Sequence, residues 1–80
     1  FYLFIITIMS MAIAPDSRFY FERGEKEYGN KNWSGAIREY SRAIKIDRNY
    51  LEAYFKRGLA RANSDSLNQA IDDFNKTISL

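Results

Sequence analysis

From Pro15 to the end of the chain, apolar residues recur at intervals of three and four positions, which is the spacing of an amphipathic helix. Polar, turn-forming residues interrupt this pattern at Gly29-Asn30, near Asp47, and again at Asn63-Ser64-Asp65. The interruptions divide this part of the chain into four segments. We therefore expect four successive helices, each with one apolar face that must be covered by another element.

Each predicted helix presents its apolar residues on one side. The apolar faces comprise Tyr20, Phe21, Gly24 and Tyr28 in the first helix, Trp33, Ala36, Ile37, Tyr40, Ala43 and Ile44 in the second, Leu51, Tyr54, Phe55, Gly58, Leu59 and Ala62 in the third, and Leu67, Ala70, Ile71, Phe74 and Ile78 in the fourth. Two pairs, Asn49 with Glu52 and Ser66 with Gln69, have the spacing of a capping box. We expect them to cap the third and fourth helices.

The second half of this helical region repeats the first at an offset of 34 residues. Identical residues occupy the aligned pairs Tyr20/Tyr54, Phe21/Phe55, Arg23/Arg57, Gly24/Gly58, Ala36/Ala70, Ile37/Ile71 and Ile44/Ile78. These seven identities exceed the roughly two expected for unrelated sequence of ordinary composition. A repeat of this length indicates a supersecondary unit that stacks on copies of itself. We predict one unit over residues 17–50 and a second, incomplete unit over residues 51–80.

The placement of aromatic and small residues in both units resembles the tetratricopeptide repeat. The matching positions are Tyr20, Gly24, Ala36, Tyr40 and Ala43 in the first unit, and Tyr54, Gly58, Ala70 and Phe74 in the second. The chain departs from the family pattern at Arg23, Glu27, Arg48, Arg57, Arg61 and Thr77. The resemblance implies an all-α fold of two antiparallel helix-turn-helix hairpins stacked as an α-solenoid. The glycines and alanines would let paired helices approach closely, while Tyr40 and Phe74 fill the space beyond.

In the resembled family, the first helix of each unit lines a concave groove that holds a peptide of a partner protein. Carried over, the resemblance implies that the peptide-binding residues are Arg18, Phe21, Glu25, Tyr28, Glu52, Phe55, Leu59, Ala62 and Asn63. Because aromatic and apolar residues predominate among them, we expect a partner segment with apolar anchors. Packing between neighbouring repeats is the alternative role for Phe21, Phe55 and Leu59. The positions that match a chaperone-carboxylate clamp hold Phe21, Glu25 and Lys56, so we do not expect that ligand.

Arginine stands at the same place in both units, next to the repeated glycine. We expect Arg23 and Arg57 to form ion pairs with an acid of the adjacent helix, such as Glu39 or Asp73. The neighbouring carboxylates of Asp72 and Asp73 point in different directions on a helix, so they do not resemble a catalytic pair. We expect both of these aspartates to be solvated.

Composition narrows the classes of function further. The chain has no cysteine and no histidine, which removes thiol nucleophiles, the commonest general base and the usual metal ligands. We therefore predict a protein that is not an enzyme and that holds no metal or cofactor. The net charge is only +2, and the basic residues are interspersed with acidic ones, so we predict no nucleic-acid partner.

Residues 1–14 differ from the rest because they carry no charge. Their length suits the apolar region of a signal peptide, and Ala12-Ile13-Ala14 has the small-x-small pattern that precedes cleavage. We expect residues 1–15 to be a signal peptide or a membrane anchor that contacts the membrane, with an apolar helix packed on the repeats as the remaining alternative. The protein would then be exported, to the periplasm or outside the cell, or anchored in a membrane, rather than cytoplasmic.

Together these patterns predict a non-enzymatic module that binds a partner protein or peptide in its groove. The alternative is a structural role in which copies of the chain assemble into a larger repeat array. The apolar face of the last helix, formed by Leu67, Ile71, Phe74 and Ile78, has no following helix to cover it. We expect this face to be covered by a continuation of the natural chain beyond Leu80 or by self-association.

Overall fold

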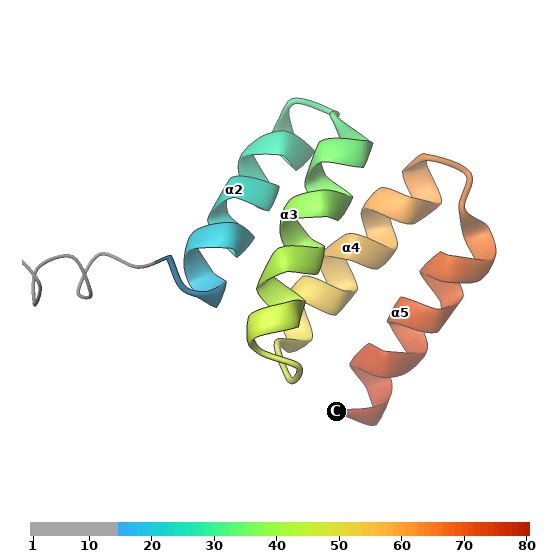
Figure 1. Cartoon of the computed structure of the whole chain (residues 1–80). Coiled ribbons are helices and arrows are strands. Elements are labelled where there is room, and N and C mark those ends of the chain that lie inside the picture. The colour runs from blue at the N-terminus through green and yellow to red at the C-terminus, as the bar shows by residue number, and fades with distance from the viewer. Residues whose placement is uncertain (1–14) are drawn as a thin grey trace, which may run out of the picture.

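A computed structural model describes residues 15–80 of the chain, which form four α-helices (Figure 1). The helices are α2 (Ser17–Gly29), α3 (Trp33–Ile46), α4 (Leu51–Asn63) and α5 (Leu67–Ser79). No strand occurs within residues 15–80, so the predicted all-α class is confirmed for this part of the chain. The predicted apolar N-terminal helix falls on residues 1–14 and lies outside the described residues.

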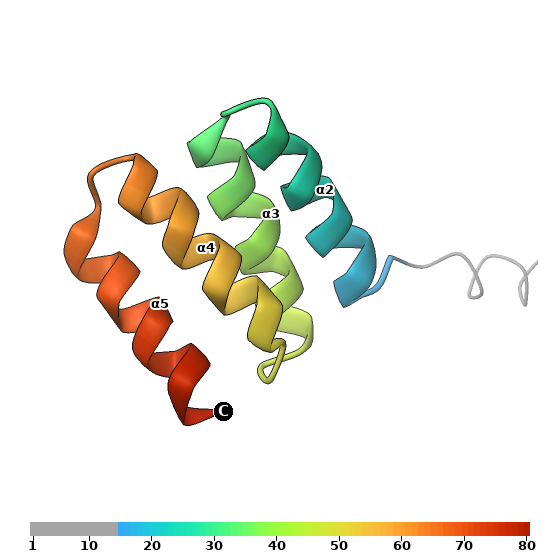
Figure 2. The ribbon, with the colours of Figure 1, turned by 180° about the vertical axis from the view of Figure 1, so that it is seen from behind.

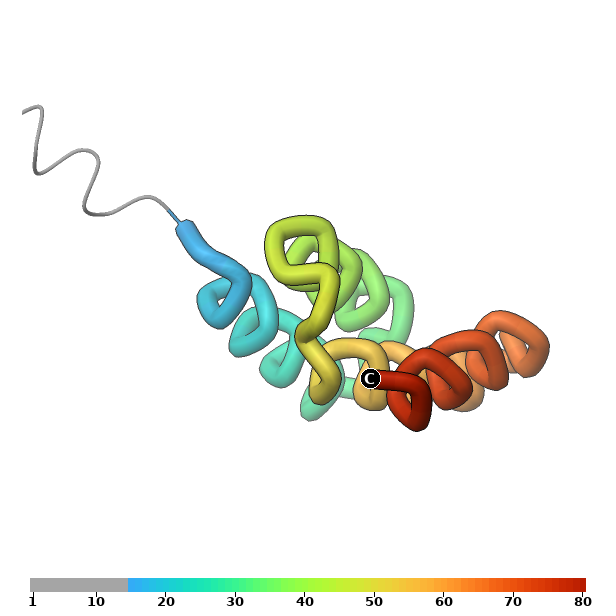
Figure 3. Tube along the Cα trace, turned by 90° about the horizontal axis from the view of Figure 1, so that it is seen from below, coloured from blue at the N-terminus to red at the C-terminus, as the bar shows by residue number. Residues whose placement is uncertain are grey.

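The four helices form two antiparallel hairpins that stack side by side. Helix α2 packs against α3, α4 packs against α5, and the two hairpins meet where α3 contacts α4 (Figure 2). Viewed from below, α3 stands out of the layer that α2 and α4 share (Figure 3). This arrangement is the stacked-hairpin solenoid that the 34-residue repeat implied.

Close helix contact within each hairpin depends on Gly24 and Gly58. A Cβ atom added at Gly24 would lie 2.5 Å from ring carbons of Tyr40, and one added at Gly58 would lie 2.6 Å from a ring carbon of Phe74. Real Cβ atoms do not approach neighbours so closely, so only glycine allows these aromatic rings to lie against the opposite helix without displacement. The roles predicted for the two glycines and the two aromatic residues are thereby confirmed.

The repeat extends to the backbone of the turns inside the hairpins. Lys31 and Asp65, which are 34 residues apart, have positive φ angles of 59° and 63°. In each turn the next amide donates back to the first helix of its hairpin, from Asn32 to the Glu27 carbonyl at 2.9 Å and from Ser66 to the Arg61 carbonyl at 2.8 Å. Both turns therefore close their hairpin with the same left-handed residue, although neither position holds glycine.

The helix caps differ from those predicted. Helix α4 begins after Tyr50 rather than Asn49, and neither Tyr50 nor Ser66 caps its helix with a side-chain hydrogen bond, so both predicted capping boxes are wrong. The turn before α4 is held by other bonds. The Asp47 carboxylate accepts the Asn49 amide at 3.0 Å, and the Tyr54 hydroxyl donates to the Arg48 carbonyl at 2.9 Å. The tyrosine bond thus fixes the turn at Arg48, where the resembled family has proline.

Side chains do cap the first two helices. The Asp16 carboxylate accepts the Phe19 amide at 2.9 Å, and the Asn32 side-chain oxygen accepts the Gly35 amide at 3.1 Å. Each bond satisfies one of the backbone N–H groups that the first turn of a helix leaves without a partner. The start of the first hairpin and its return helix are therefore set by short polar side chains.

Candidate functional site

Lys56 joins the first helices of the two hairpins. Its ammonium nitrogen on α4 lies 3.6 Å from Oε1 of Glu25 and 4.6 Å from the ring centroid of Tyr28, both on α2. The carboxylate and the aromatic face attract the same cation, which holds α2 and α4 together along one side of the molecule. Lys56 was not among the residues predicted to bind peptide. At the repeat offset it aligns with Glu22, and no pattern in the sequence indicated that it would meet Glu25.

Glu25 also accepts a buried hydrogen bond from the second helix of its own hairpin. The Tyr40 hydroxyl donates to Oε1 of Glu25 at 2.5 Å, and the Tyr40 side chain is fully buried. Burial raises the pKa of Tyr40 well above its usual value, and the hydrogen bond to Glu25 raises it further. The hydroxyl therefore keeps its proton and serves as a donor. Glu25, predicted as a groove residue, is the meeting point of α2, α3 and α4.

The remaining predicted residues of α2 are largely occupied by contacts inside the protein. The Phe21 ring stacks on Tyr50 with centroids 5.0 Å apart and also lies 5.5 Å from the Tyr40 ring. Tyr28 is half-buried and packs edge-on against Trp33. Arg18 is exposed and pairs with Glu22 one turn away. Phe21 thus packs between the two units, which is the alternative role that the sequence left open for it.

The predicted residues of α4 are more accessible. Phe55 has 45% of its surface exposed, and its ring is tilted against that of Phe74, with centroids 6.0 Å apart. Leu59 and Ala62 are half-buried, and Glu52 is exposed. The Asn63 side chain folds back and donates to the Leu59 carbonyl at 2.9 Å. The structure therefore does not present all nine predicted residues as one free surface. Phe21, Glu25 and Tyr28 are partly covered by contacts inside the protein, whereas three of the five α4 residues are exposed.

The second hairpin contains a buried ion cluster. Arg57 donates to both oxygens of Asp73 at 2.7 and 2.9 Å, and Arg61 adds a third bond at 2.8 Å. Another nitrogen of Arg57 reaches Ser41 of α3 at 3.1 Å, so this cluster lies against the first hairpin. The predicted pairing of Arg57 is confirmed. The prediction that Asp73 is solvated is wrong, because its side chain faces α4 and is buried beneath two arginines.

The first hairpin carries a looser version of the same cluster. Arg23 lies 3.5 Å from Glu39, as predicted, and Arg38 and Arg42 lie 3.4 and 3.3 Å from its other oxygen. The carboxylate is buried at 2% exposure, whereas the Arg23 side chain is 56% exposed. These longer contacts come from three arginines that all reach solvent. One oxygen of Glu39 accepts no hydrogen bond within the described residues.

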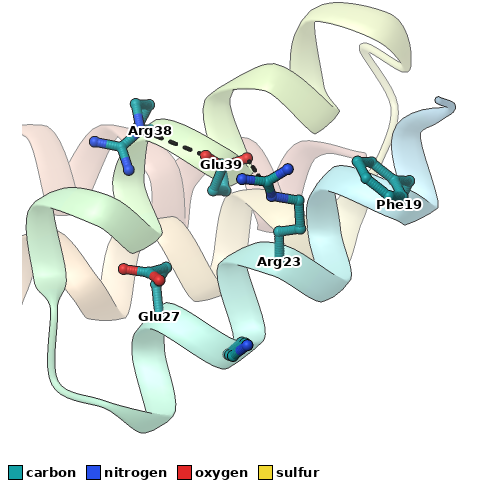
Figure 4. A pocket seen from close by; sticks show the side chains of 6 residues that line it. Phe19, Arg23, Glu27, Arg38 and Glu39 are labelled. Atoms are coloured by element: carbon teal, nitrogen blue, oxygen red, sulfur yellow. Dashed lines mark hydrogen bonds and ion pairs between the residues drawn. The ribbon is translucent and has the colours of Figure 1, made fainter.

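A surface hollow of ≈ 340 Å³ opens beside this looser cluster (Figure 4). It is lined by Phe19, Arg23, Lys26, Glu27, Arg38 and Glu39. At the repeat offset, these residues correspond to Ala53, Arg57, Ala60, Arg61, Asp72 and Asp73 of the second hairpin. Ala53 and Ala60 are fully buried in clusters with residues of α3. The hollow therefore lies on the face of the first hairpin that corresponds to the face by which the second hairpin packs on the first. Its lining carries three basic and two acidic side chains.

None of the helices in residues 15–80 is long and apolar enough to cross a membrane. A family model described as a TPR repeat matches residues 24–65, which is more than half of the chain. The matched segment begins at Gly24 in α2, includes all of α3 and α4, and ends in the turn after α4. No curated protein and no solved structure matches the chain significantly.

Proposed function

The chain belongs to the tetratricopeptide repeat family, and we propose that it is a non-enzymatic module that binds a partner polypeptide along α4. Repeats of this family typically serve as scaffolds for protein–protein interaction rather than as catalysts. The specific partner surface proposed here is the side of α4 that carries Glu52, Phe55, Leu59, Ala62 and Asn63. We call this surface the α4 groove face.

The accessibility of Phe55 beside Leu59 is the observation that carries this proposal. An aromatic ring that is 45% exposed offers a partner much apolar area at a small cost in side-chain entropy. Leu59 lies one turn further along the same helix and is half-buried. A partner segment with two apolar anchors at matching spacing would cover both side chains. Flanking polar contacts would come from Glu52 and Asn63 at the two ends of the face.

The α2 residues support this face by holding α4 in place. Lys56 is bound to Glu25 and Tyr28, so α4 is held by polar contacts on the side next to α2. A surface that is already ordered loses less conformational entropy when it binds. In this proposal Glu25 and Tyr28 act as positioning residues, and Phe21 packs against the clusters that α3 and α4 form between the two units.

Selection from a library of short random peptides tests the proposal. Peptides selected on the full chain should lose at least tenfold in affinity for the Phe55→Ala and Leu59→Ala variants, since removal of a central apolar anchor costs more than 1 kcal/mol. Ile46→Ala is the matched control, because Ile46 is an exposed apolar residue at the end of α3. Circular dichroism would show that each variant keeps its helices. Unchanged binding by both α4 variants would refute the site.

We also propose that the protein acts outside the cytoplasm, either exported or held at a membrane. The support is the uncharged sequence of residues 1–14 and its small-x-small ending. Determination of the N-terminal residue of the mature protein tests this location. A mature chain that begins at Pro15 or Asp16 would support export after cleavage. A chain that keeps residues 1–14 and stays in the soluble fraction would contradict both export and anchoring.

A further inference from the structure

The basic residues of the chain are not shared equally between the two hairpins. Residues 17–46 contain seven basic and four acidic side chains, a net charge of +3, whereas residues 51–80 contain four of each. Aligned positions differ in the same direction, because Lys26 aligns with Ala60 and Arg38 aligns with Asp72. The excess positive charge therefore belongs to the first hairpin and is not a property of the repeat.

Helix α3 gathers part of this charge on one side. Arg38, Arg42 and Lys45 are spaced at i, i+4 and i+7, so they lie on one stripe of the helix, and all three are exposed. The buried Ala36 and Ala43 lie on the opposite side. None of the three basic residues belongs to the clusters that α3 forms with α4. Packing of the second hairpin therefore leaves this stripe accessible.

Two residues of α2 extend the stripe across the hollow of Figure 4. Arg23 and Lys26 line this hollow together with Arg38, so the basic side chains of the two helices form one surface. We call it the basic face, and it consists of Arg23, Lys26, Arg38, Arg42 and Lys45.

The acids beside the basic face balance only part of its charge. Its three arginines share the buried carboxylate of Glu39 at distances of 3.3–3.5 Å. Glu27, the other acid that lines the hollow, accepts a hydrogen bond from the Asn32 side chain. Neither Lys26 nor Lys45 takes part in an ion pair within residues 15–80. Five cations thus meet two carboxylates on one side of the hairpin.

The basic face also borders an exposed aromatic ring and the start of the fold. Phe19 is 43% exposed, and the Arg23 guanidinium lies 5.6 Å from its ring centroid. Arg42 lies 5.9 Å from the ring centroid of Tyr20, so the stripe on α3 reaches the first turn of α2. The uncharged residues 1–14 join the chain just before this turn. The cations are therefore close to the point where an apolar segment enters the fold.

We propose that the basic face binds the anionic headgroups of a lipid bilayer. A cluster of about four to eight basic residues beside an apolar segment is attracted to anionic lipids. An exposed phenyl ring among these cations favours a bilayer over a nucleic acid, because the ring can enter the apolar layer beneath the headgroups. This role goes beyond peptide binding and leaves the α4 groove face free. It rests on the proposed location only in requiring that the protein meets a membrane.

The residues of this face suit headgroups better than they suit another helix. Phe19 and Lys26 stand where the second hairpin has Ala53 and Ala60, which are buried against α3. Close packing of a helix at these two places would overpack the phenyl ring and bury the ammonium group. Lipid phosphates can instead pair with the ammonium group while it stays hydrated.

Sedimentation of the full chain with lipid vesicles tests the proposal. One set of vesicles contains phosphatidylcholine alone, and the other contains equal parts of phosphatidylcholine and anionic phosphatidylglycerol. Binding common to both sets would reflect residues 1–14 and bears on the proposed location. The additional affinity for the anionic vesicles measures the basic face, and we expect it to be at least about tenfold at low ionic strength. In about 1 M salt this difference should largely disappear.

Matched variants locate the effect on the surface. Arg42→Gln should weaken binding to the anionic vesicles about fivefold, whereas Lys76→Gln should leave it unchanged. The two residues are repeat counterparts, and each cation lies 5.9 Å from the tyrosine ring of its own hairpin. The Lys26→Gln/Lys45→Gln variant, which keeps all ion pairs of Glu39, should bind about tenfold more weakly or less. Circular dichroism would show that each variant keeps its helices.

Three results would overturn the proposal. The first is equal affinity of the full chain for the neutral and the anionic vesicles. The second is equal weakening by Arg42→Gln and Lys76→Gln, which would show that only net charge matters. The third is binding of a short nucleic-acid duplex that depends on Arg42 while the anionic vesicles show no such dependence, since nucleic acid would then be the ligand.

Discussion

Arg23 and Arg57 occupy the same position in two successive hairpins, yet their surroundings differ. The Arg57 side chain is 15% exposed and holds both oxygens of Asp73, while Arg23 is 56% exposed and makes one long contact with Glu39. The difference comes from neighbouring elements, because Arg57 also contacts α3 of the first hairpin. Arg23 faces the open hollow of Figure 4. Burial of an ion pair in a repeat protein thus depends on its place in the stack.

The two clusters also differ in how well their charges are satisfied. Asp73 receives three short bonds from two arginines, which compensates for removal of its carboxylate from water. Glu39 is equally buried, but its contacts are all 3.3 Å or longer. Its arginines can exchange those contacts for water at little cost. Arg61 Nε has no hydrogen-bond partner within the described residues, but both oxygens of Asp73 are paired, so we expect the second cluster to contribute more to stability than the first.

The largest expected effect is the loss of Asp73. In the Asp73→Ala variant, Arg57 and Arg61 lose their partner while mostly buried, so the free energy of unfolding should fall by about 3 kcal/mol. In the Glu39→Ala variant, the arginines that lose their partner are about half-exposed, so the free energy of unfolding should fall by only about 1 kcal/mol. Urea unfolding followed by circular dichroism would measure both. Equal losses would show that the difference in burial has no energetic consequence.

The second effect concerns the glycine contacts. Gly24→Ala should destabilise the protein by about 1–2 kcal/mol, because overpacking against the buried Tyr40 ring outweighs the roughly 1 kcal/mol gained in helix propensity. Gly58→Ala should cost less, since Phe74 is only half-buried and its ring can move. Gly29→Ala is the control, because no atom lies within 4 Å of its added methyl group. A larger loss from Gly58→Ala than from Gly24→Ala would contradict this account.

A smaller effect is expected where the two hairpins carry different aromatic residues. Tyr40→Phe gives the first hairpin the residue that the second hairpin has at the aligned position, Phe74. The substitution removes the hydrogen bond from the Tyr40 hydroxyl to Glu25. We expect a loss of about 1 kcal/mol in thermal or urea unfolding. The reciprocal Phe74→Tyr variant should gain nothing, because the residue aligned with Glu25 is Leu59, which offers no side-chain acceptor. Stabilisation by Phe74→Tyr would show that another acceptor is within reach.

The smallest effect is expected at the contact between α2 and α4. Lys56→Met removes the ion pair with Glu25 and the cation–π contact with Tyr28, and should cost about 0.5–1 kcal/mol at low ionic strength. In about 1 M salt, where the Debye length falls to ~3 Å, part of this loss should disappear. The loss in Asp73→Ala should persist, because buried pairs are screened less. If salt reduced the loss in unfolding free energy of Asp73→Ala as much as that of Lys56→Met, the ion cluster around Asp73 would not be protected from solvent.

Much of the fold could be predicted from local patterns. The apolar spacing indicated four helices, and the recurrence of Gly24 with Tyr40 and of Gly58 with Phe74 indicated where helices approach. Asn49 is not the N-cap of α4, and Ser66 stands at the N-cap of α5 without the predicted side-chain bond, because a capping pattern states only that a bond can form. The turn before α4 uses Asp47 and Tyr54 instead, and Tyr54 reaches back six residues to do so. Such a bond depends on the packed position of the helix.

By itself the sequence determined the helical class and the 34-residue register, because these depend on side-chain type and on spacing along the chain. Only the tertiary structure decided which copy of each repeated residue is buried. Phe21 is covered by Tyr50 while Phe55 is open, and Arg57 is shielded while Arg23 reaches solvent. The physical reason is that repeated residues have the same neighbours along the chain but different neighbours in space. A residue's exposure is therefore set by the element stacked on it.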